Sequence, residues 1–200
     1  MMLTSDLRQA LKDQMEAMEK QNELVHRGGY ISEDFVQRLF TPENLMDQLQ
    51  LDRTTEGVQD VQGLVNFIRI RARKTFAILV RIGEGKRIAT LQNSQPMVDD
   101  HLLFDNHDGD ASKPYCILKK LQGIPALHDL ASEVYKIQWD FPTAFSPDHH
   151  LEFDPRFFKF PFQTKSKCIA NGGNGHVYRV KFEEGCVKDL SGGDIVSFAV

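Results

Sequence analysis

The chain has 200 residues, a hydrophobic fraction of 41% and a formal net charge of −4. This length allows one domain with a buried core, or one domain and part of another. The acidic balance excludes a general electrostatic attraction to nucleic acid or to an anionic membrane, so we expect neither as a partner.

The N-terminus and the cysteines indicate a reducing compartment. The first residues lack an apolar core and carry Asp6 early, which is not the pattern of a signal peptide, and the longest apolar run, 75–80, is too short to span a bilayer. Cys116, Cys168 and Cys186 are odd in number and show no C-x-x-C spacing, which argues against a disulfide framework or a zinc site. We expect a location in the cytoplasm, with the nucleus as the alternative.

The first third of the chain predicts helices. Residues 4–26 have the apolar spacing of an amphipathic helix, which the pair Gly28-Gly29 would end. Further helix starts are expected at Ser32 and at Thr41-Pro42-Glu43, where a capping residue precedes a proline at the first helical position.

Apolar residues from 58 to 82 recur close to every 3.6 residues, and Gly83 supplies a stop. This spacing predicts one long helix. Its segment 69–74 is basic, which is typical of a solvated face or of pairing with acidic helices, with phosphate binding as the alternative. Helices are also expected over 86–92 and 125–136, so residues 1–136 are predicted to form a helical N-terminal domain.

The polar segment 94–114 is expected to be a loop without a metal. Aligning Gly109 with the invariant glycine of an EF-hand places Phe104 and Tyr115 where the calcium ligands need carboxylates. His101, His107 and their acidic neighbours lack the spacing that would bring them together on a helix, which argues against a metal site.

Residues 137–162 are rich in aromatic residues and prolines. Proline opposes helix formation, so an extended connector is expected, and its aromatic side chains should be packed because free linkers are polar.

The last part of the chain, 163–200, contains the candidate functional site. Residues 167–182 consist of an apolar approach, a glycine-rich turn and an alternating run, which predict strand, tight loop and strand. Glycines in the turn let backbone N–H groups approach phosphate oxygens closely. The residues expected to bind a nucleotide are Ile169, Ala170, Asn171, Gly172, Gly173, Asn174, Gly175, His176, Val177 and Ala199.

This stretch resembles the glycine-rich loop of eukaryotic protein kinases, whose pattern is G-x-G-x-x-G-x-V. On that pattern Gly172 and Gly175 are the second and third glycines, Ala170 replaces the first, and Asn174 stands where many kinases have an aromatic residue. The resemblance implies that Val177 covers an adenine ring.

After a polar insertion, residues 195–200 resemble the start of the kinase strand V-A-I-K, one residue short of its lysine. The order of Trp139-Asp140-Phe141, Phe145 and Phe160-Pro161-Phe162 before the glycine turn is similar to proteins of filamentous fungi in which a helical region precedes a protein kinase domain.

We therefore expect an α+β fold, in which a mainly helical N-terminal domain is followed by a small antiparallel β-sheet like the first strands of a kinase N-lobe. The resemblance implies ATP as ligand, with Mg²⁺ only in a full-length kinase, and a protein kinase truncated before its catalytic lysine, catalytic loop and metal motif, without activity of its own. The alternatives are a structural hairpin on a helical module that binds a protein partner and, more distantly, a nucleophilic enzyme.

Overall fold

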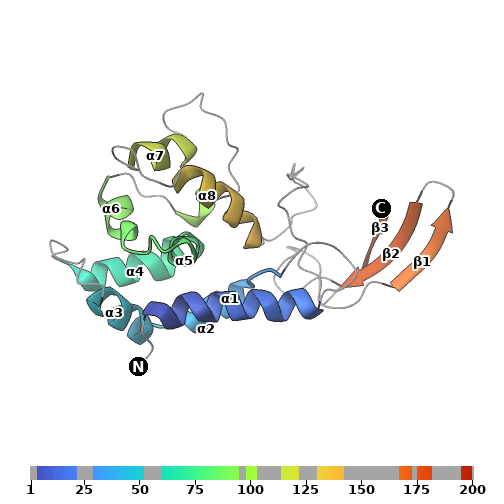
Figure 1. The fold of residues 1–200 in the computed structure, drawn as a ribbon, viewed down its shortest axis with the longest axis horizontal. Coiled ribbons are helices and arrows are strands. Elements are labelled where there is room, and N and C mark those ends of the chain that lie inside the picture. The colour runs from blue at the N-terminus through green and yellow to red at the C-terminus, as the bar shows by residue number, and fades with distance from the viewer. Residues whose placement is uncertain are drawn as a thin grey trace. The chain divides into compact units, whose positions relative to one another are not determined.

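The computed structural model describes residues 4–21, 29–51, 60–94, 98–102, 114–121, 130–141, 167–172, 175–181 and 195–199. Figure 1 shows the elements formed by these residues. The α-helices are α1 (Thr4–Gln21), α2 (Glu33–Leu39), α3 (Pro42–Leu51), α4 (Val61–Arg71), α5 (Arg73–Ile82), α6 (Arg87–Ser94), α7 (Pro114–Leu121) and α8 (Leu130–Ile137). The 3-10 helices are η1 (Asp99–His101) and η2 (Gln138–Asp140), and the strands are β1 (Lys167–Gly172), β2 (Gly175–Lys181) and β3 (Ile195–Ala199).

The chain divides into two compact units. The first consists of 1–12 and 34–139, and the second of 13–33 and 140–200. The helix α1 therefore contributes its first half to one unit and its second half to the other.

Helix α5 is the centre of the first unit. All side chains from Thr75 to Val80 are buried, and α5 packs against α4, α6, α8 and η1. The rings of Phe40 and Phe76 lie 5.2 Å apart and join α5 to the end of α2. An element buried on all sides is stabilised mainly by removal of apolar surface from water, and Leu64, Val65, Ile68, Leu118, Ala131 and Val134 supply the surrounding buried side chains.

In the second unit, the segment after α1 lies against the residues that follow η2. The backbone N–H of Ile31 donates to the carbonyl of Asp140 at 2.8 Å, and Tyr30, Ile31 and Phe141 are buried. Gly29 approaches α1 so closely that a Cβ there would overlap the backbone carbonyl of Met15.

Two helix signals in the sequence are confirmed. The hydroxyl of Thr41 accepts a hydrogen bond from the N–H of Asn44 at 3.2 Å, which is the expected cap of α3. Gly83 ends α5 in the left-handed conformation, with φ at 83°, and its N–H reaches the carbonyl of Val80.

The long helix predicted from 58 to 82 is wrong, because the chain breaks at Ala72 into α4 and α5. Ala72 has φ −136° and ψ 30°, outside the helical region. The apolar spacing continues across the break because Ile68 and Ala72 are both fully buried. The apolar spacing therefore predicts which face is buried, but it does not predict that the backbone bends.

The aromatic connector is confirmed as packed over its first residues, although it is not extended there. Trp139 and Phe141 are buried, and the rings of Tyr135 and Trp139 meet edge to face at 6.2 Å. Residues 138–140 form the 3-10 helix η2, which directly continues α8. The rest of the connector, 142–162, lies outside the described residues.

The predicted α+β class is wrong. Over the part of the chain whose packing can be interpreted, which does not include the strands, 83% of the residues are helical, so the fold is mainly α-helical. The backbone pairing of β1, β2 and β3 does not by itself define the class. The physical reason is that the apolar helix faces bury one another without needing a sheet. No helix among the described residues is long and apolar enough to cross a membrane.

Candidate functional site

The glycine-rich turn predicted from the sequence lies between β1 and β2. Backbone pairing of these two strands is antiparallel, and Gly172 is opposite Gly175 at the end of the ladder. The two residues that join them, Gly173 and Asn174, lie outside the described residues. Two glycines at the closing pair leave the backbone amides of this end uncovered by a Cβ, which is the property that phosphate binding requires.

Three of the expected nucleotide-binding residues occupy one cross-strand row. Ala170 is opposite Val177 in the pairing of β1 with β2, and Val177 is opposite Ala199 in the pairing of β2 with β3. Directly opposite residues of antiparallel strands share a face, so this row offers small and β-branched apolar residues side by side. Asn171 and His176 form the next pair toward the turn.

Ile169 interrupts the ladder. The register moves from Cys168 opposite Tyr178 to Ala170 opposite Val177, so Ile169 is the additional residue of a β-bulge. Its side chain is 44% exposed. A bulge turns a side chain away from the regular alternation, and this one places an exposed apolar residue directly before the row.

A second arrangement, which the sequence did not reveal, surrounds the break between α4 and α5. In a continuous helix the N–H groups of Lys74 and Thr75 would donate to carbonyls four residues earlier. Here both donate to the carboxylate of Asp99, each at 2.9 Å, and the Thr75 hydroxyl lies 3.0 Å from the same carboxylate. Asp99 thus caps α5 from 25 residues away in place of Ala72, which has no side-chain cap to offer.

On the α4 side of the break, an arginine side chain donates to a backbone carbonyl. The guanidinium of Arg73 donates to the backbone carbonyl of Arg69 at 2.6 Å, the carbonyl that a continuous helix would pair with the Arg73 N–H. Two side chains therefore replace the missing backbone hydrogen bonds. No short-range pattern contains Asp99, so only its tertiary position could have identified it.

Two carboxyl groups near this break have shifted pKa values. Burial raises the pKa of Asp99, and its hydrogen bonds from Lys74 and Thr75 oppose that shift without cancelling it. The pKa of Glu43 is lowered, first by a hydrogen bond from its own backbone N–H and then by the Thr41 hydroxyl, with a smaller contribution from the charge of Arg69. Asp99 is thus a partly buried carboxyl group whose pKa is raised at the start of α5.

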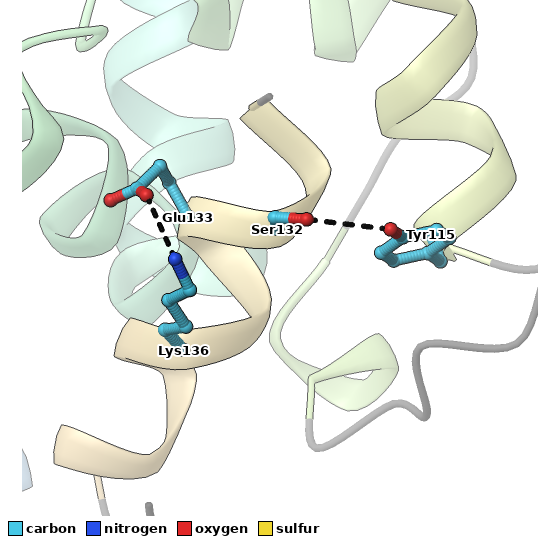
Figure 2. A network of polar contacts seen from close by, with 4 residues as sticks. All are labelled: Tyr115, Ser132, Glu133 and Lys136. Carbon is cyan, nitrogen blue, oxygen red and sulfur yellow. Dashed lines mark hydrogen bonds and ion pairs between the residues drawn. The ribbon is translucent and has the colours of Figure 1, made fainter. Parts of the chain in front are cut away.

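Figure 2 shows a polar contact between helices α7 and α8 and an ion pair within α8. The hydroxyl oxygens of Tyr115 and Ser132 lie 3.4 Å apart, and Lys136 pairs with Glu133 at 3.3 Å. An exposed pair of this kind contributes little to stability. We assign these contacts to packing, because they bring no nucleophile and base together.

Among the described residues no group of histidine, cysteine, aspartate and glutamate side chains could hold a metal ion. Asp99 and His101 lie in η1, but Asp99 is engaged with α5. His107 lies outside the described residues, as does the second half of the segment in which a metal was considered.

Comparisons with known proteins identify no relative. No protein-family model, curated protein or solved structure matches the chain.

Proposed function

We propose that the turn between β1 and β2 binds the phosphates of a nucleoside triphosphate through its backbone amides. The observation that carries this proposal is the register: Gly172 closes the ladder opposite Gly175, and the row Ala170, Val177 and Ala199 follows directly. A glycine pair for the phosphates and an apolar row for the base stand in the order that the resemblance to kinase glycine-rich loops implies.

The chemistry proposed is binding without phosphoryl transfer. Transfer depends on positioning and on neutralising charge with lysine and magnesium ligands. The 200 residues contain neither an H-R-D nor a D-F-G motif. A coupled assay with ATP and magnesium is therefore expected to give no turnover, and magnesium-dependent turnover would contradict this part of the proposal.

Isothermal titration of the chain with ATP tests the binding directly. We expect a submillimolar Kd that weakens at least about tenfold in Gly172→Val, because a β-branched side chain obstructs the approach of phosphate to the backbone. Ser197→Val is the matched control, since it places the same side chain in the same sheet, opposite Arg179 and away from the turn. Absence of ATP binding, or equal binding by the glycine variant, would contradict the proposal.

A second function, binding of a protein partner by the helical unit, is favoured by a different observation. Ile70 on α4 is 80% exposed, and no other large apolar side chain among the described residues of this unit is classed as exposed. We propose that such a partner binds in the reducing compartment that the cysteine pattern favours. Nucleotide and partner would then occupy different parts of the chain.

A further inference from the structure

The junction of α4 and α5 exposes an isoleucine between two arginines. We call residues 69–73 the α4–α5 elbow. Ile70 is 80% exposed, and Arg69 and Arg71 beside it are exposed as well. An exposed isoleucine on its own is ordinary, so the argument depends on how it is held and on the charges around it.

The fold fixes the exposure of Ile70. Ile68 and Ala72, two residues before and after it, are fully buried, and helical geometry directs a residue at that spacing to the opposite side. The elbow itself is held by the hydrogen bonds that Asp99 of η1 accepts from the start of α5, and by the hydrogen bond from Arg73 to the carbonyl of Arg69. The surface is therefore preorganised rather than a frayed helix end.

The elbow is the basic part of an acidic chain. Residues 61–82 contain five basic residues and no acidic one, although the chain as a whole carries a net charge of −4. The acidic groups described nearby are Glu43, which interacts electrostatically with Arg69, and Asp99, which interacts electrostatically with Lys74. Arg71, which is exposed in the last turn of α4, does not contribute to the pKa shift of either of these carboxyl groups.

We propose that the α4–α5 elbow binds an acidic peptide segment of a partner protein, in which carboxylates flank an apolar side chain. The carboxylates pair with Arg69 and Arg71, where arginine offers bidentate hydrogen bonds, and the apolar side chain covers Ile70. The inference rests on the second function proposed above and names its surface and the chemistry of its partner. It is independent of nucleotide binding.

Other anionic partners fit the elbow less well. A nucleic acid would use the arginines, but it could cover Ile70 only by unstacking bases, which costs free energy. A membrane surface requires a broad apolar helix face, and that face of α4, formed by Leu64, Val65 and Ile68, is buried in the core. Only a peptide supplies opposite charge and apolar cover at the scale of three residues.

Fluorescence anisotropy with a labelled acidic peptide, in which leucines alternate with glutamate–aspartate pairs, tests the inference on the full chain. We expect saturable binding that weakens about tenfold in Ile70→Ser and in Arg71→Glu. It should weaken similarly when the peptide leucines become serine, and it should fall with rising salt. Circular dichroism checks that both variants keep the helical content of the parent chain.

Lys20→Glu is the matched charge control, because Lys20 is exposed in the last turn of α1 as Arg71 is in the last turn of α4. It should leave peptide binding and ATP binding unchanged. Equal peptide binding by Ile70→Ser or Arg71→Glu would overturn the inference while leaving a helical binding module possible elsewhere. Binding of an oligothymidylate or of phosphatidylserine vesicles in place of the peptide would also overturn it.

Discussion

Asp99 makes the side-chain contacts that cap the central helix of the helical unit. Its carboxylate accepts from two backbone N–H groups and lies within hydrogen-bonding distance of the hydroxyl of Thr75, at the point where α5 would otherwise begin without a cap. When a helix that starts inside a protein loses its cap, the backbone N–H groups of its first turn are buried without hydrogen-bond acceptors. The contact also joins η1 to the central helix.

We expect Asp99→Ala to lower the free energy of unfolding by about 1–3 kcal/mol, since it leaves the N–H groups of Lys74 and Thr75 without their acceptor. Urea denaturation followed by circular dichroism measures this loss. Asp100→Ala is the control, because Asp100 is the exposed neighbour in η1. An equal stability for both variants would show that the cap is dispensable.

Titration of Asp99 gives a pH dependence of defined sign. Its pKa is raised in the folded chain by burial, so the folded state holds this proton more tightly than the unfolded state does. The free energy of unfolding should therefore decrease as pH rises from the ordinary aspartate value through the raised pKa. Asp99→Asn should lack this component in urea titrations, and a parent-minus-variant difference that increases with pH in this window would contradict the assignment.

Gly83 illustrates a residue whose role follows from backbone conformation alone. With φ at 83° it occupies a region that costs an L-residue with a Cβ about 1–2 kcal/mol. We expect Gly83→Ala to lower the midpoint of thermal unfolding, and Gly83→Asn to lower it less because asparagine tolerates this region. A larger loss for asparagine than for alanine would point to side-chain crowding instead of backbone strain.

At the scale of elements, sequence signals identified helix ends better than helix continuity. The cap at Thr41 and the stop at Gly83 are local chemistry, so each could be predicted from a few neighbouring residues. The break at Ala72 depends on Asp99, which is distant in sequence, and could not be predicted from local spacing. The exposure of Ile70 agrees with helical spacing, since the buried Ile68 and Ala72 lie two residues on either side of it, but the hydrogen bonds that hold this surface become evident only once the bend is known.

The row of Ala170, Val177 and Ala199 gives an element-scale test of how a nucleotide would be oriented. If this row receives the base while the glycine turn receives the phosphates, Ala199→Leu should weaken ATP binding several-fold and leave binding of inorganic tripolyphosphate unchanged. Isothermal titration with both ligands distinguishes the two regions. Equal weakening of both ligands would place the phosphates, rather than the base, beside Ala199.

At the scale of the whole molecule, the helices could be predicted from the sequence, whereas the fold class could not. Apolar periodicity anticipated most of the helices, and burial of Trp139 and Phe141 agrees with the expectation that connector aromatics find cover. The class failed because a glycine turn and alternating residues describe local pairing, whereas class depends on which elements form the core. The kinase resemblance and the ten residues expected to bind a nucleotide remain predictions.

The most direct test of the proposed function is a two-dimensional ¹H–¹⁵N correlation spectrum of the full chain titrated with ATP. We predict that amide resonances of Gly172, Gly175 and His176 shift in a saturable way, that tripolyphosphate alone reproduces these shifts, and that amides of α4 and α5 do not move. Saturable shifts confined to α4 and α5, or unchanged spectra at millimolar ATP, would contradict the assignment of the glycine turn as a phosphate-binding site.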